Sequence, residues 1–184
     1  VQEYSQKFAL SILVYCLMQN HVHFIAIPTR EDSLAKTFQA VHMRYAQYFN
    51  NKLKSRGHLW QGRFYSCILD EPHLLVATKY IERNPVRAKI INKPWQWKWS
   101  SALAHVNKAV ESPLKLADFF KITGISYASW REYIDSKDDA KTLNEIRKHT
   151  LTGRPLGSVL FMEKLEKWLG RRLSALPRGR PKRK

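Results

Sequence analysis

The chain has 184 residues, which is room for one domain of ordinary size or one domain with a small extension. Apolar residues make up 44% of it, so it can bury a core and is not an intrinsically disordered chain. The 32 Lys and Arg residues against 15 Asp and Glu give a net charge of +17, which attracts polyanions and makes nucleic acid the first candidate partner and an anionic membrane the second.

The sequence shows no signal for a membrane or for secretion. It has no apolar run long enough to span a bilayer and no N-terminal signal-peptide pattern. Cys16 and Cys67 form no CxxC pair, so a reducing compartment is the default. We therefore expect a cytoplasmic protein with no membrane partner.

The first third of the chain predicts a helix end, a hairpin and a long helix. Residues 3–10 have the pattern of a short helix, and two strand-like runs, 11–18 and 21–27, flank a two-residue break. Two such runs across a short break predict a β-hairpin. Ser33 is a suitable N-cap for a helix over 34–53, whose apolar residues recur every three or four positions.

The middle and C-terminal parts predict one strand and several helices. Residues 59–69 alternate loosely and contain aromatic side chains, so we expect a strand there. A helix begins after the capping residue Asp70 and ends near Asn84, which a proline follows. Beyond residue 107 the pattern is helical, and an amphipathic helix covers roughly 158–173.

His21 and His23 are candidate metal ligands. Side chains two apart on a strand point the same way, so both imidazoles project from one face. Two neighbouring imidazoles on a rigid strand suit a divalent metal. The alternative is a pair of histidines on a half-exposed strand without a ligand.

Tyr80 is a candidate nucleophile, with Asn84 one helical turn further along the same face. A tyrosine beside a metal-bound phosphate can form a covalent ester. The alternative is that Tyr80 is a core aromatic and Asn84 a cap before the proline.

Three further segments have two interpretations each. Trp95, Trp97 and Trp99 either stack on unpaired bases or, as we favour, pack against the core. Arg154 lies in a glycine-flanked loop that either faces phosphate or only turns the chain. The tail around Arg178 and Arg180 either enters the minor groove of A·T-rich DNA or only adds nonspecific attraction.

The motifs occur in an order that resembles the REP-associated tyrosine transposases of the HUH single-strand transposase superfamily. The resemblance rests on Gln-Asn-His-Val-His-Phe at 19–24, Gly-His-Leu-Trp-Gln-Gly-Arg-Phe-Tyr at 57–65, the stretch 79–90 and Trp-Ser-Ser at 99–101. It covers about residues 5–105. The most specific part is Tyr-Ile-x-x-Asn-Pro-Val-Arg-Ala, which begins at Tyr80.

The resemblance implies both the fold and the roles of the site residues. His21 and His23 match the metal ligands, Tyr80 the nucleophile, and Asn84 the polar residue that completes the metal site. The implied fold is α+β, a ferredoxin-like antiparallel sheet with helices on one face, followed by a helical extension and a basic tail. We expect a catalytic domain over 1–110, a helical extension over 111–173 and a disordered AT-hook-like tail over 174–184.

The chain departs from the family pattern at two places. Gln19 stands where the family usually has proline. Family members also normally have another strand and most of a helix before the position of Val1. We therefore expect a sheet that lacks one strand and exposes an edge.

The implied activity is cleavage and rejoining of single-stranded hairpin DNA through a 5′-phosphotyrosine link, with Mg²⁺ or Mn²⁺ and in a monomer or homodimer. A·T-rich duplex is a further expected partner of the tail. A noncatalytic DNA-binding or regulatory protein and a replication-initiator-type nickase are the alternatives. The expected contacts to DNA are made by Arg44, Arg56, Arg63, Arg83, Arg87, Arg154, Arg178 and Arg180.

Overall fold

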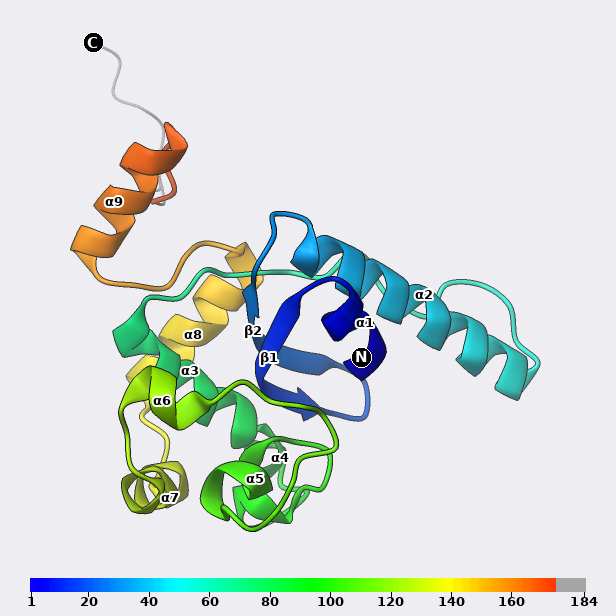
Figure 1. Cartoon of the computed structure of the whole chain (residues 1–184), viewed down its shortest axis with the longest axis horizontal. Helices are drawn as coiled ribbons and strands as arrows, with labels where there is room; N and C mark the ends of the chain where they lie inside the picture. The colour runs from blue at the N-terminus through cyan, green and yellow to red at the C-terminus, as the bar shows by residue number, and fades with distance from the viewer. Residues whose placement is uncertain (175–184) are drawn as a thin grey trace.

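The computed structural model describes residues 1–174 and shows an α+β fold in which helices surround a β-hairpin (Figure 1). Strands β1 (Leu10–Leu17) and β2 (Val22–Pro28) pair antiparallel, with a bulge between Ile12 and Val14. The expected class, the antiparallel sheet and the hairpin are thereby confirmed. Within the described residues the sheet has these two strands.

The helices follow the predicted order. The long helix over 34–53 and the helix that begins after Asp70 are confirmed, and the Asp70 carboxylate accepts a bond from the His73 amide as an N-cap does. No helix between residues 1 and 174 is long and apolar enough to cross a membrane. The helices are α1 (Gln2–Lys7), α2 (Ser33–Leu53), α3 (Glu71–Glu82), α4 (Asn84–Arg87), the 3₁₀ helix η1 (Pro94–Gln96), α5 (Ala102–Val106), α6 (Phe119–Thr123), α7 (Tyr127–Asp135), α8 (Ala140–Thr152) and α9 (Val159–Leu169).

The strand expected over 59–69 is wrong. This segment is an irregular loop whose one ladder-like contact is a bridge between Leu69 and Leu156. Its aromatic residues act singly, because Trp60 stacks on a histidine of α2 and Phe64 packs on Phe38. The alternating aromatic residues therefore make separate contacts with α2 and do not form one face of a strand.

Strand β1 is buried on both sides, because helices pack on both faces of the hairpin. Ile25 and its neighbours pack with Leu74, Ala77 and Ile81 of α3. Phe24 and Ala26, which alternate with Ile25 along β2, pack instead with Phe38 of α2. The helices α2 and α3 therefore lie on opposite faces of the sheet, whereas the resemblance implied helices on one face.

The outer edge of β1 is covered by chain that follows α4. The Leu17 amide donates to the Trp99 carbonyl at 2.8 Å, and the Ala117 amide donates to the Ile12 carbonyl at 2.7 Å. Trp97 packs against the core and its Nε1 donates to the Leu17 carbonyl at 2.9 Å. Trp95 also packs there, while Trp99 is about half exposed. The structure thus favours packing for the first two tryptophans.

Residues beyond the expected domain boundary at 110 contribute to the same core. Trp130 and Ile134 of α7 are fully buried and belong to the cluster formed by β1 and α3. By contrast, α9 has no buried residue and projects from the body of the molecule (Figure 1). The division of the chain at 110 and 173 remains a prediction.

Candidate active site

His21 directly precedes β2 at the end of the hairpin turn, and His23 is the second residue of β2. Their rings are nearly perpendicular, at 86°, with centroids 5.0 Å apart. The Asn20 side-chain oxygen accepts a bond from His21 Nδ1 at 2.7 Å. That bond places the proton on Nδ1 and leaves the lone pair of His21 Nε2 free for another partner.

Tyr80 and Asn84 approach the two histidines from the end of α3 and the start of α4. Asn84 Nδ2 lies 3.3 Å from His21 Nε2, although the two residues are 63 positions apart in the chain. The Tyr80 ring meets His23 edge to face, with centroids 6.0 Å apart. The structure therefore brings all four sequence-predicted residues together at one place.

Loss of solvent contact favours the neutral form of both imidazoles, and more strongly for His23 than for His21. It lowers the pKa of His21, and it lowers the pKa of His23 to about 4, with the charges of His21 and Arg87 adding to the effect. His23 Nε2 is buried and has no hydrogen-bond partner in the described part of the chain. An unpartnered buried nitrogen on a neutral imidazole has the chemistry of a metal ligand.

The donor set fits a divalent metal but is not a classical all-acid or cysteine cluster. Two imidazole nitrogens and one amide oxygen suit Mn²⁺, and Mg²⁺ less well because it prefers oxygen. Residues 1–174 contain no group of three or more His, Cys, Asp or Glu side chains placed to hold a metal ion. The group around His21 has only two such side chains, and Asn84 would be the third ligand.

Arg87 contacts both the ring and the backbone of Tyr80. Its guanidinium lies over the phenol ring, 4.3 Å from the centroid, and Nη2 donates to the Tyr80 carbonyl. Burial lowers the pKa of Arg87, and the Asp138 carboxylate, 3.6 Å from Nη1, opposes that shift. Arg87 is thus a largely buried cation that contacts the candidate nucleophile.

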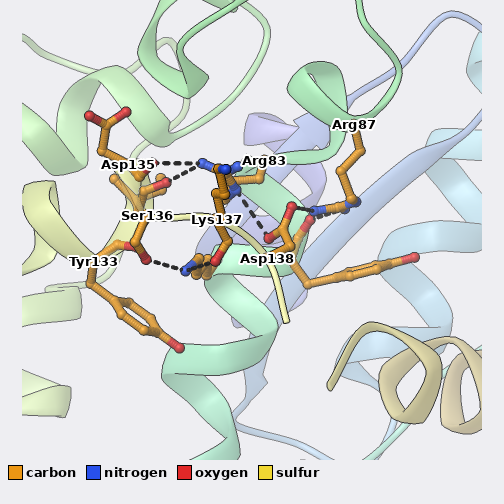
Figure 2. Close-up of polar contacts among 10 residues, drawn as sticks. Arg83, Arg87, Tyr133, Asp135, Ser136, Lys137 and Asp138 are labelled. Atoms are coloured by element: carbon orange, nitrogen blue, oxygen red, sulfur yellow. Dashed lines mark hydrogen bonds and ion pairs between the residues drawn. The ribbon is translucent and has the colours of Figure 1, made fainter. Parts of the chain in front are cut away.

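A segment following α7 fastens the same helix. Figure 2 shows Asp138 between Arg83 and Arg87, with Arg83 Nε 3.0 Å from Asp138 Oδ1. Arg83 Nη1 also donates to the Ile134 carbonyl at 2.7 Å. Lys79 Nζ donates to Ser136 Oγ at 2.6 Å. We call residues 133–138 the α3 strap, because they bind three successive cations of this helix and its continuation.

Sequence reasoning missed the α3 strap and a second buried carboxylate. Asp138 is an ordinary acid in a polar stretch, and only the fold brings it to α3. Glu82 is fully buried, where it accepts bonds from Ser101 Oγ at 2.5 Å and His105 Nδ1 at 2.6 Å. Thr78, one turn earlier in α3, is also buried, so the two side chains lie on the same inward face of this helix.

The arginines predicted to bind DNA fall into separate environments. Arg44, Arg56 and Arg63 are exposed on α2 and the loop after it. Arg83 is buried and bound within the protein, so in this arrangement it does not face DNA. Arg154 is half-buried, and its carbonyl accepts a bond from Cys67 Sγ at 2.9 Å. Arg178 and Arg180 lie outside the described residues 1–174.

The four clustered residues lie in the part of the chain that matches a known family. Residues 1–84 match the family model described as "Transposase IS200 like". The matched segment is less than half of the 184-residue chain. It spans His21, His23, Tyr80 and Asn84, but not the α3 strap. No curated protein and no solved structure is significantly similar to the chain.

Proposed function

We propose that this protein is a metal-dependent tyrosine transposase of the REP-associated type, which cleaves and rejoins single-stranded hairpin DNA. The observation that carries the proposal is the cluster itself: two neutral imidazoles, an amide and a phenol come together from separate segments. The family match over residues 1–84 supports the general activity. The covalent chemistry is our inference from the side chains present together with the resemblance to the REP-associated tyrosine transposases.

The metal would be held by His21, His23 and Asn84. A divalent ion there would draw charge from the scissile phosphate and so favour attack on phosphorus. Asn84 would turn its amide so that the oxygen, and not the nitrogen, faces the ion. The low pKa of His23 keeps its nitrogen unprotonated and ready to bind at neutral pH.

Tyr80 would supply the nucleophile. Its phenol oxygen forms a bond to phosphorus as the bond from phosphorus to the 3′-oxygen breaks, which leaves a 5′-phosphotyrosine and a free 3′-hydroxyl. The phenol proton leaves to solvent, and the 3′-oxygen takes up a proton. Attack by another 3′-hydroxyl reverses these steps and joins strands without ATP. Arg87 fixes the ring from one side throughout.

The tail is proposed to add a second, duplex-binding contact. Arg178 and Arg180 would enter the minor groove of A·T-rich DNA, with the intervening glycine allowing close approach. Deletion of residues 174–184 should weaken duplex binding and leave hairpin cleavage at saturating DNA unchanged. A deletion that abolishes cleavage at saturation would contradict this division of roles.

The proposal is tested by trapping the covalent intermediate. The protein is incubated with end-labelled hairpin DNA and Mn²⁺, then denatured and separated by size. We expect a protein–DNA adduct in the parent and in Tyr65→Phe, and none in Tyr80→Phe. An adduct that persists in Tyr80→Phe would reject the assigned nucleophile, whereas hairpin binding with no adduct in any variant would favour the noncatalytic DNA-binding alternative.

A further inference from the structure

A long stretch of the chain between the two histidines and Tyr80 carries basic residues and no acidic ones. Residues 33–69, which make up α2 and the loop after it, contain no Asp or Glu. Every charged Lys or Arg side chain of this stretch is therefore positive, with no negative side chain between them. The basic residues are Lys36, Arg44, Lys52, Lys54, Arg56 and Arg63, all of them exposed.

These cations have few acidic partners within the described residues, and Lys52 Nζ lies over the Tyr48 ring, 5.9 Å from its centroid. Lys36 pairs with Asp32 at 2.6 Å, just before the stretch begins. Arg44 donates to the Tyr4 hydroxyl at 3.1 Å, which is a neutral partner. In the described part of the chain the other four have no ion pair. Their charge is therefore directed to solvent.

The far part of α2 also presents aromatic rings that the core does not cover. The buried residues of α2 are Ser33, Thr37 and Phe38, all in its first two turns. Beyond them the helix extends past the sheet (Figure 1). Tyr45 is 47% exposed and Tyr48 is 59% exposed, one turn apart on the outer part of the helix.

The loop after α2 completes this aromatic group. Trp60 stacks on His42, with centroids 4.2 Å apart and an interplanar angle of 20°, and its Nε1 donates to the His42 carbonyl at 3.1 Å. The Tyr45 ring lies 5.8 Å from Trp60. The stacking and the hydrogen bond fix the loop on the helix, so the rings are arranged before any ligand arrives.

We infer that this aromatic–basic surface, formed by residues 42–63, binds the unpaired bases and phosphates of single-stranded DNA. Tyr45 and Tyr48 stack on bases, while Lys52, Lys54 and Arg56 contact phosphates. The choice of DNA rests on the proposed function. The choice of unpaired strands rests on the rings, because an exposed ring can stack on a base only where that base is not already stacked in a duplex.

The surface lies away from the candidate nucleophile. Tyr80 is on α3, which packs on the face of the sheet opposite to α2. The inferred contact would therefore hold DNA that flanks the cleaved position. Changes on this surface should alter DNA binding and leave the chemical step at saturating DNA unaltered.

The test measures binding without cleavage. Tyr80→Phe protein without metal is titrated into a fluorescent oligothymidine of about 20 nucleotides, longer than the ~4–16 nucleotides that one small binding surface covers. A duplex of equal length is titrated in parallel. We expect Tyr45→Ala with Tyr48→Ala to weaken oligothymidine binding about 100-fold and duplex binding much less, because the loss of each stacked base costs about tenfold.

Two controls separate stacking from other effects. Phenylalanine at both positions keeps the rings and should restore binding to within about twofold. Trp168→Ala removes an 80% exposed ring on α9, outside the aromatic–basic surface. It should leave the affinities for oligothymidine and for duplex unchanged. If the double variant has a lowered melting temperature, Tyr48→Ala alone is used, because Tyr48 is the more exposed of the two. Its affinities for oligothymidine and for duplex are then compared in the same way.

Three results would overturn the inference. One is unchanged oligothymidine binding in the alanine variants, and another is equal weakening for duplex and single strand. The third is self-association of the parent protein that the alanine variants abolish, which would assign the surface to a second copy. Because Tyr80 is already replaced, failure of the covalent mechanism cannot produce any of these results.

Discussion

Helices α2 and α3 both carry basic residues, but they use them in opposite ways. On α3 and its continuation, Lys79, Arg83 and Arg87 are buried or nearly so, and all three bind the α3 strap. On α2 and its loop, the basic side chains are exposed and largely without acidic partners. The same residue types therefore hold the nucleophile helix in place on one face of the sheet and remain available to a ligand on the other.

The buried and exposed cations differ in the free energy lost when the acidic partner is removed. A buried cation must keep its carboxylate, because taking the charge out of water is otherwise strongly unfavourable. An exposed cation is solvated and gains little from any single neighbour. The buried set should therefore affect stability and alignment, whereas the exposed set should affect affinity and its dependence on salt.

The largest expected effect concerns the proposed metal ligands on the α3 face. His21→Ala and His23→Ala should each reduce metal-dependent cleavage about 100-fold or more, since each removes a ligand. Neither should unfold the protein, because both side chains border the site and not the centre of the core. Adduct formation with Mn²⁺ and a thermal melt provide the measurements. A large loss of melting temperature in both variants, with no metal effect in the parent, would favour a packing role.

The α3 strap should control stability. Asp138→Asn removes the carboxylate between Arg83 and Arg87 and should lower the free energy of unfolding by about 3 kcal/mol, measured by urea denaturation. Asp32→Asn is the matched control, since the Asp32–Lys36 pair is exposed on both sides. That variant should be close to the parent. Similar losses in the two variants would remove the contrast between buried and exposed pairs.

Replacing Arg87 by lysine tests alignment apart from charge. Lysine keeps the positive charge near Asp138 but loses the planar group that lies on the Tyr80 ring. We expect cleavage at saturating DNA to fall about tenfold, or by ~1.4 kcal/mol in the activation barrier, with hairpin affinity unchanged. A drop in hairpin affinity with normal cleavage at saturation would show that Arg87 contacts DNA instead.

The smallest effect is expected from single cations of the aromatic–basic surface. Arg56→Gln should leave the melting temperature unchanged. It should reduce the slope of log affinity for single-stranded DNA against log salt by roughly 0.7, because one phosphate is no longer neutralised by the protein. Titrations at several salt concentrations measure this slope. An unchanged slope together with a lowered melting temperature would place Arg56 in the structural set with Arg83.

The candidate site was more predictable from sequence than its support. His21 and His23 are two apart on one strand, and Tyr80 and Asn84 are one turn apart on successive helices, so local spacing already placed each pair on a face. Asp138 has no such local mark, because only tertiary packing brings it beside Arg83. For the same reason Arg83 was expected to bind DNA, although the fold buries it.

The contrast between local spacing and tertiary packing also explains which helices and strands were predicted correctly. The hairpin and α2 follow from periodicity and from the breaks between them. The segment 59–69 was expected to be a strand because aromatic and polar residues alternate in it, and alternation is the strand signal. In the structure, Trp60 and Phe64 instead anchor a loop to α2 one side chain at a time. Periodicity cannot separate a paired strand from a loop with regularly spaced anchors.

During synthesis of the chain, α3 is made before the α3 strap that holds it. Asp138 leaves the ribosome 55 residues after Arg83, so the nucleophile helix is synthesised well before the carboxylate that holds it. A chain interrupted between these points would have the whole family-matched segment, with His21, His23, Tyr80 and Asn84, but two arginines with no counterion. Chains that end before Asp138 would therefore have the candidate site residues without the carboxylate that holds Arg83 and Arg87, so the proposed activity would require synthesis past this residue.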